Sequence, residues 1–246
     1  MRSRFARDAA LLQIANAVDS AASLVTSVVV FRLFGAIGYG TYAEALTLFA
    51  IIFFLGNVGL SQVTVARVAE AMGRGDAVTV TRWLAVFTKA YGFVAILLTT
   101  LGFSLGPVLG EVIYHDRTIG VWTALLCLSG PISAPFAFLQ CTLAGTRRMK
   151  LLGEMENLKS MARIVLVVAG ALSFGTPLGA VAGELGAAAF SIPLALLAYS
   201  KARRDSGPAL PSFRELVGQA RSTGTTELIH GVAEGFRVTV RKNLTA

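Results

Sequence analysis

The sequence predicts an all-α integral membrane protein, a bundle of six transmembrane helices whose N-terminus lies in the cytoplasm. Composition is the first reason: of the 246 residues, 54% are hydrophobic and 15% are charged, and the mean hydropathy is +0.67. A soluble domain typically carries about 25% charged residues, so this composition is typical of a chain surrounded by lipid. The second reason is that apolar residues gather in stretches of about 20, the length of a helix that crosses a bilayer. The third is the distribution of basic residues between these stretches.

Six apolar stretches form the predicted bundle, which occupies residues 1–200. The first follows a basic N-terminus, as the core of a secretory signal would. It is too long for such a signal and contains Gln13, Asn16 and Asp19, so we interpret it as a retained helix. The predicted spans are 9–30, 41–62, 83–105, 119–143, 155–174 and 178–200.

Prolines and charges distinguish the fourth and fifth spans. Gly130-Pro131 and Pro135 interrupt the fourth span. Since proline removes a backbone hydrogen bond, a kink is expected there. The first turns of the fifth span hold Glu156, Lys159 and Arg163, so its start is expected in the membrane interface.

Basic residues occur mainly at the N-terminus and in every second connection. Cytoplasmic loops of membrane proteins are enriched in Lys and Arg, so six spans with a cytoplasmic N-terminus explain the alternation. The opposite connections contain Arg32 and Arg117. A nucleic-acid partner is not expected, because the basic residues lack interleaved aromatics and a single face. The basic residues assigned to the cytoplasmic side are Arg2, Arg4, Arg7, Arg67, Arg74, Arg82, Arg147, Arg148, Lys150, Lys201, Arg203, Arg204, Arg214 and Arg221.

The longer connections have structure of their own. Residues 63–81 have the length of a short surface helix and a turn, with Asp76 placed to cap the helix that follows. Residues 201–212 are charged and contain two prolines, which predicts a cytoplasmic linker. Residues 213–246 carry charges throughout and are interpreted as an amphipathic helix or as the incomplete start of a second bundle.

The first span has a polar stripe that points to a cavity. Its members recur at steps of three and four, so they share one helix face. Polar groups inside a membrane face a water-filled cavity or join neighbouring helices. Asp19, which flanks the stripe, favours the cavity. The stripe consists of Gln13, Asn16, Ser20, Ser23 and Ser27.

Four further ionisable residues lie within predicted spans: Glu44 and Lys89, which are near helix ends, and Arg163 and Glu184. Glu184 is interpreted either as a proton- or cation-linked site or as the partner of Arg163. Around it, Gly179 and Gly183 form a G-x-x-x-G pattern that permits close helix approach.

The sequence predicts no enzyme, no metal site and no cofactor. Cys127 and Cys141 lie 14 residues apart, about 21 Å on a helix, which is beyond disulfide reach. No Cys/His cluster has metal-ligand spacing. A nucleophile–base pair and a glycine-rich phosphate loop are likewise not found in the sequence.

Three stretches between or within the predicted spans carry recognisable sequence motifs. Residues 32–42, RLFGAIGYGTY, follow the pattern R-x-x-G-x-x-x-Y-G-x-Y. Residues 55–60, LGNVGL, followed by RVAE and GRGD, are similar to a D-x-G-L segment with Asn57 where an Asp is frequent. Residues 145–156, GTRRMKLLGEME, continuing to Arg163, follow G-x-x-R-x-x-x-L-x-x-x-E. Together they resemble the polysaccharide flippases of the multidrug/oligosaccharidyl-lipid/polysaccharide exporter superfamily.

This resemblance implies a fold of two six-helix bundles that face each other across a central cavity and work by alternating access. It covers residues 9–200, one bundle. The implied cavity residues are Asn16, Asp19 and Ser23, with Arg32 and Asn57 near the motif positions. Cationic groups at the cavity mouth would suit a lipid pyrophosphate, and Arg32 would lie toward the outer side.

The functional hypothesis is a half-length flippase-like protein that moves lipid-linked oligosaccharide across the bacterial inner membrane for polysaccharide export, such as O-antigen of lipopolysaccharide or exopolysaccharide. The expected partners are the lipid bilayer, the lipid-linked oligosaccharide and a second half-length chain or a second copy. One alternative is a non-transporting remnant or partner subunit of a transporter. Another is a small-molecule, cation-coupled antiporter. The candidate residues are Asn16, Asp19, Ser23, Arg32, Asn57, Arg163 and Glu184.

Overall fold

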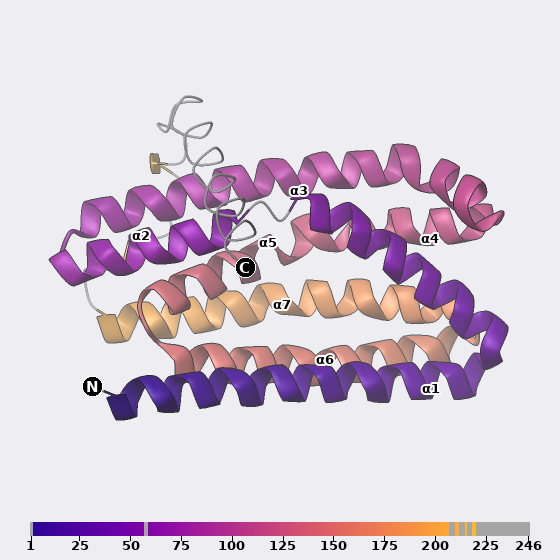
Figure 1. Ribbon diagram of the computed structural model, residues 1–246, viewed down its shortest axis with the longest axis horizontal. Helices are drawn as coiled ribbons and strands as arrows, with labels where there is room; N and C mark the ends of the chain where they lie inside the picture. Colours follow the sequence, from indigo (N-terminus) through magenta and orange to yellow (C-terminus); the bar gives the residue numbers. More distant parts are fainter. Residues whose placement is uncertain (1, 57–58, 207–209, 212–214, 216–217, 220–246) are drawn as a thin grey trace.

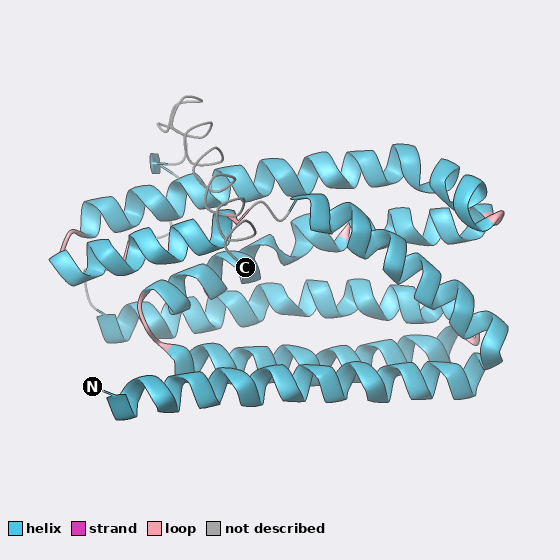
Figure 2. Cartoon of the chain, in the orientation of Figure 1, coloured by secondary structure: helices cyan, strands magenta, loops and turns pink. Residues whose placement is uncertain are grey.

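The computed structural model describes residues 2–56, 59–206, 210–211, 215 and 218–219. Every regular element in this part of the chain is an α-helix, and the helices are joined by short turns (Figure 2). The elements are α1 (Arg2–Gly56), α2 (Leu60–Arg74), α3 (Ala77–Tyr114), α4 (Arg117–Cys127), α5 (Ser129–Gly145), α6 (Met149–Phe174) and α7 (Pro177–Ser206).

The predicted all-α membrane fold is confirmed. Within the described residues, five helical segments are long and apolar enough to cross a membrane. Large apolar side chains point outward from them: Leu24, Val112 and Leu197 are each 68% exposed. Lipid rather than water suits such a surface, and helices satisfy their own backbone hydrogen bonds in lipid. The segments are Asn16–Phe53, Ala77–Tyr114, Arg117–Gly145, Met149–Phe174 and Pro177–Arg204.

A single glycine reverses the chain inside α1. Gly35 has φ 69° and ψ −172°, a combination that only glycine adopts readily because it lacks a Cβ. The ribbon of α1 turns back on itself at one end of the bundle (Figure 1). The predicted span 9–30 and most of the predicted span 41–62 therefore lie on either side of this reversal, and α1 ends at Gly56. Six crossings and the cytoplasmic N-terminus stay predictions.

The basic connections meet at one end of the bundle. The N-terminus, the α2–α3 turn, the α5–α6 turn and the last residues of α7 lie together there (Figure 1). The reversal at Gly35 and the α3–α4 and α6–α7 turns lie at the other end. The structure thus brings together the connections that the charge pattern assigned to one side of the membrane.

Helix α2 and its following turn match the expected surface helix. Gly75, with φ 73°, ends α2, and the Asp76 side chain accepts a hydrogen bond from the Thr79 amide at 3.0 Å. Hydrogen bonds from the Thr79 hydroxyl and amide lower the pKa of Asp76. The predicted cap is confirmed, and it fixes where α3 begins.

Several helix bounds differ from the predicted ones. α1 ends at Gly56, before residue 62, and α6 begins at Met149, before residue 155. α7 continues to Ser206, into the predicted linker 201–212, because Lys and Arg suit a helix that leaves the apolar core. Beyond it, Leu210 is buried and the Tyr199 hydroxyl donates to the Pro211 carbonyl at 2.7 Å. The stretch 213–246 lies outside the described residues apart from residues 215, 218 and 219.

The predicted kink of the fourth span lies between α4 and α5, which meet at Leu128. Pro131 has no amide hydrogen to donate to the Cys127 carbonyl, four residues earlier. The Thr99 hydroxyl of α3 approaches that carbonyl at 2.8 Å and also the carbonyl of its own helix, at Ala95. A side chain of the neighbouring helix therefore satisfies the backbone group that proline leaves unpaired.

Replacing Thr99 with Val should destabilise the folded protein by about 1–3 kcal/mol, because the Cys127 carbonyl loses its donor. Thr100→Val is the matched control, since the exposed Thr100 hydroxyl bonds only within its own helix, to Ile96, among the described contacts. Thermal unfolding of the two variants in detergent measures the difference. Equal melting temperatures would contradict the role given to Thr99.

Candidate substrate cavity

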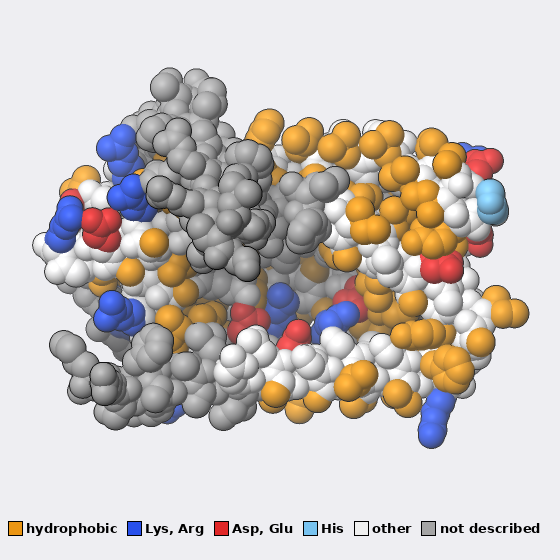
Figure 3. Space-filling model, viewed as in Figure 1, with side chains coloured by type: hydrophobic (Ala, Val, Ile, Leu, Met, Phe, Trp, Pro, Cys, Tyr) orange, Lys and Arg blue, Asp and Glu red, His pale blue; other side chains and the backbone are white. Residues whose placement is uncertain are grey.

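A polar cavity of about 370 Å³ lies inside the bundle. It opens between α1 and the helices packed above it, where Figure 3 shows acidic and basic side chains together in a hollow. Charged side chains are rare within transmembrane segments, and where they occur there they usually indicate a functional site. The described lining is Asp19, Leu46, Phe49, Leu126, Ser129, Ser133, Glu156, Lys159, Ser160, Arg163, Glu184, Ala187 and Ala188.

Helix α6 contributes the largest polar share of this lining. Glu156 lies three and four residues before Lys159 and Ser160, and these lie four and three residues before Arg163, so the four residues share a face. Lys159 lies ten residues into the helix that starts at Met149, about 15 Å along its axis. α6 thus starts before the predicted span and carries Glu156 and Lys159 to the cavity, while their position relative to the membrane interface stays a prediction.

Arg163 and Glu184 form a two-pronged ion pair between α6 and α7. Arg163 Nη2 donates to Glu184 Oε1 at 2.8 Å and Arg163 Nε donates to Glu184 Oε2 at 2.8 Å. The Tyr42 hydroxyl also donates to Oε1, at 2.8 Å, and Arg163 Nη1 donates to Ser23 Oγ at 3.3 Å. The pairing of Glu184 with Arg163, one of the two interpretations of the sequence, is what the structure contains. These contacts form a cluster. It joins both legs of α1, the segments before and after Gly35, to α6 and α7.

Asp19 and Lys159 lie beside this pair. Ser160 donates to Asp19 Oδ1 at 2.7 Å, which ties the first leg of α1 to α6. The Lys159 ammonium lies 4.4 Å from the centroid of the Phe136 ring of α5, a distance typical of a cation–π interaction. Both charged groups line the cavity and are held by neutral partners.

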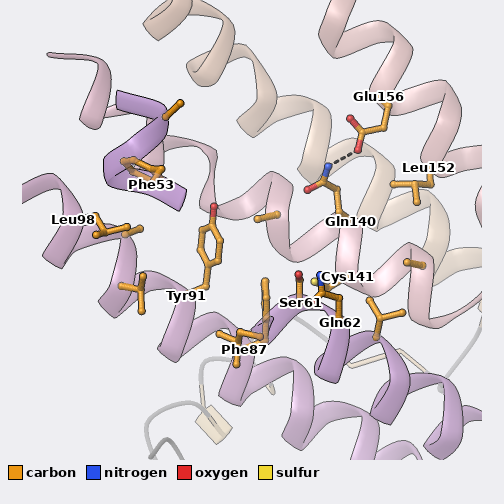
Figure 4. Close-up of a pocket in the computed structure, with 17 residues that line it drawn as sticks. Phe53, Ser61, Gln62, Phe87, Tyr91, Leu98, Gln140, Cys141, Leu152 and Glu156 are labelled. Carbon is orange, nitrogen blue, oxygen red and sulfur yellow. Dashed lines mark hydrogen bonds between the residues drawn. The ribbon is translucent and has the colours of Figure 1, made fainter. Parts of the chain in front are cut away.

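A second cavity, of about 660 Å³, adjoins the polar one. Its lining is mostly apolar, and Glu156 lines both cavities. In Figure 4, Gln140 and Glu156 lie at one side of this apolar cavity, where Gln140 donates to Glu156, and Phe53 and Leu98 lie at the other. The polar cavity and the apolar cavity thus meet at Glu156.

The structure brings together four of the seven residues singled out from the sequence: Asp19, Ser23, Arg163 and Glu184. Asn16 is exposed on α1, one turn before Asp19. Arg32 is exposed beside the reversal at Gly35, away from the described lining of the cavity. Asn57 lies outside the described residues.

Sequence reasoning missed Lys159, Ser160 and Tyr42 as members of the site. The signal for the first two was available, because they share the spacing that places Glu156 and Arg163 on one face. Tyr42 carried no such signal: its contact with Glu184 joins residues 142 positions apart. No cluster of three or more potential metal ligands occurs among the described residues.

Comparison with protein families identifies the chain. A family model described as "Polysaccharide biosynthesis protein" matches residues 5–237, nearly the whole sequence. The chain belongs to this family. The polysaccharide biosynthesis family is the exporter family whose motifs the sequence resembles, and its members are membrane transporters. Comparisons with curated proteins and with solved structures find no match. The protein is thus a transporter-like member of a polysaccharide biosynthesis family, and it contains a polar cavity.

Proposed function

We propose that this protein moves lipid-linked oligosaccharide across the bacterial inner membrane, with its N-terminus in the cytoplasm, as a step in polysaccharide export. The observation that carries the proposal is the polar cavity: three acidic and two basic side chains converge inside the described bundle of a polysaccharide-family protein. Burying such groups in lipid is costly unless they pair or face a polar ligand. A flippase needs such a path for the hydrophilic end of its cargo.

The apolar cavity supports an amphiphilic cargo. It adjoins the polar cavity at Glu156, so one molecule could place a hydrophilic part on one side of this residue and a hydrocarbon part on the other. A purely polar solute would not bind favourably in the larger, apolar cavity. Lipid-linked oligosaccharide combines both parts.

The cluster also supports alternating access. Arg163 and Glu184 join α6 and α7 to both legs of α1 through Ser23 and Tyr42. The structure contains the joined arrangement of this junction, and separation of the same hydrogen bonds would provide the second arrangement that alternating access requires. Asp19, which is exposed and lines the cavity, would be accessible to cargo that enters it.

Reconstitution tests the proposal directly. The purified chain is placed in vesicles that contain a fluorescent prenyl-diphosphate-linked disaccharide, and a membrane-impermeant reductant reports the fraction that crosses. We expect crossing to exceed that of protein-free vesicles. No excess would contradict the proposal and favour a non-transporting remnant or partner subunit. Crossing of small cationic drugs in place of the disaccharide would favour the antiporter.

Replacing Asp19 with Leu should lower this crossing about tenfold or more, the equivalent of about 1.4 kcal/mol, while the protein still accumulates in the membrane. The carboxylate lines the cavity and its partner is a neutral serine, so its loss leaves no unpaired charge behind. Ser104→Leu is the control and should retain transport, because Ser104 is exposed on α3, bonds within its own helix to Thr100 and lies outside the described lining of both cavities. Loss of accumulation by Asp19→Leu would instead assign Asp19 a structural role.

A further inference from the structure

We infer that the polar cavity holds an uncharged or amino-bearing sugar part of the cargo and rejects an anionic one. The inference rests on the proposed function and specifies the substrate class of the same cavity. Its starting point is the charge of the lining. Asp19, Glu156 and Glu184 carry three negative charges, and Lys159 and Arg163 carry two positive ones, so the described lining has an excess of one negative charge.

The positive charge of Arg163 is not available to a ligand. Its guanidinium engages both oxygens of Glu184 at 2.8 Å and reaches Ser23 with its remaining nitrogen. Glu184 in turn also accepts from Tyr42. An anion that approached Arg163 would have to displace a carboxylate held by several hydrogen bonds.

The charges that Arg163 and Glu184 leave in the lining favour a ligand group that donates hydrogen bonds over one that accepts them. Lys159 is the one cation left in the described lining, and its ammonium lies against the Phe136 ring, with the carboxylates of Asp19 and Glu156 in the same cavity. Each carboxylate can accept about four hydrogen bonds, more than Ser160 and Gln140 supply to them among the contacts of the described residues. These free acceptor positions fit hydroxyl and ammonium groups.

Sugar hydroxyls are such donors, and the hydroxyls of Ser129 and Ser133 in the same lining add partners for them. A uronate or phosphate at this place would meet two carboxylates in a medium of low dielectric constant, where like charges repel strongly. The anionic diphosphate of a carrier lipid then lies outside the polar cavity.

Three prenyl-diphosphate-linked disaccharides that differ only at the terminal sugar test the inference in the vesicles described above. Their terminal sugars are glucose, glucosamine and glucuronic acid. For the unaltered chain we expect the glucose and glucosamine forms to cross at least about tenfold faster than the glucuronic acid form. Glu156→Gln keeps a group that can accept from Gln140 but removes the excess charge, so it should raise the relative rate of the glucuronic acid form.

Glu154→Gln is the matched control. Glu154 lies on the same helix two residues away, is exposed and pairs with Lys150 at 3.9 Å, so its replacement should leave the ratio unchanged. Faster crossing of the glucuronic acid form by the unaltered chain would overturn the inference and leave the proposed function standing. An unchanged ratio in Glu156→Gln would overturn it as well. Failure of all three lipids to cross would remove the proposed function itself.

Discussion

A chain in which Glu184 is replaced by Leu should accumulate poorly in the membrane. The replacement leaves the Arg163 guanidinium without its carboxylate in a site where the arginine side chain is 29% exposed. Removing one partner of a buried ion pair typically costs about 3–5 kcal/mol. The Tyr42 hydroxyl loses its acceptor at the same time. Such a loss is a large share of a total folding stability of about 5–15 kcal/mol.

The double variant Arg163→Met/Glu184→Leu separates the charge from the packing. Replacing both members of a buried pair with apolar residues of similar volume is often neutral for stability. We therefore expect the double variant to accumulate better than Glu184→Leu alone, which membrane fractionation and detergent melting curves would measure. If the double variant were as unstable as the single one, shape rather than charge would explain the defect. Because the cluster forms part of the cavity, transport should stay low in both variants.

Gly183→Ala should strongly destabilise the contact between α6 and α7. A Cβ at Gly183 would collide with the backbone of Val167 and Leu166 on α6, and backbone atoms have no room to move aside. Overpacking of this kind costs about 1–3 kcal/mol or more. Since Gly183 precedes Glu184, separating α6 from α7 here would also strain the Arg163–Glu184 pair.

The same substitution three residues later, Gly186→Ala, should not destabilise the protein. At Gly186 the nearest atom to a new Cβ is Leu166 Cδ1 at 3.9 Å, an ordinary contact. Alanine is about 1 kcal/mol better than glycine in a helix, so Gly186→Ala should melt at the same temperature or higher. Melting in detergent compares the two variants. A Gly183→Ala protein as stable as Gly186→Ala would show that the two helices are not in close contact at Gly183.

Local patterns account for what could be predicted of the fold. The helices around the predicted spans follow from runs of apolar residues, and α2, its glycine end and the Asp76 cap follow from residues within a few positions of one another. Bounds were less predictable, because a helix such as α7 continues into charged residues once its apolar part is formed. The reversal at Gly35 needed only one residue outside helical geometry, which composition alone does not reveal.

The candidate site was predictable where its members share one helix. Asp19 and Ser23 stood out by their spacing on the first span, and the same reasoning applied to α6 would have added Lys159 and Ser160. Tyr42 contacts Glu184, and Gln140 contacts Glu156, each from a different helix. No spacing along the chain encodes such contacts.

By itself, the sequence determined that this protein uses lipid as its solvent, and it located the polar groups that the membrane must then accommodate. The reason is that apolar length and charge scarcity act residue by residue, whatever the packing. Only the tertiary structure decided which of those polar groups neutralise one another. Small residues such as Gly183 let α6 and α7 approach until Arg163 reaches Glu184, and this pairing leaves Asp19, Glu156 and Lys159 facing the cavity. Electrostatic partners depend on distances between helices, and those distances are a property of the packed bundle.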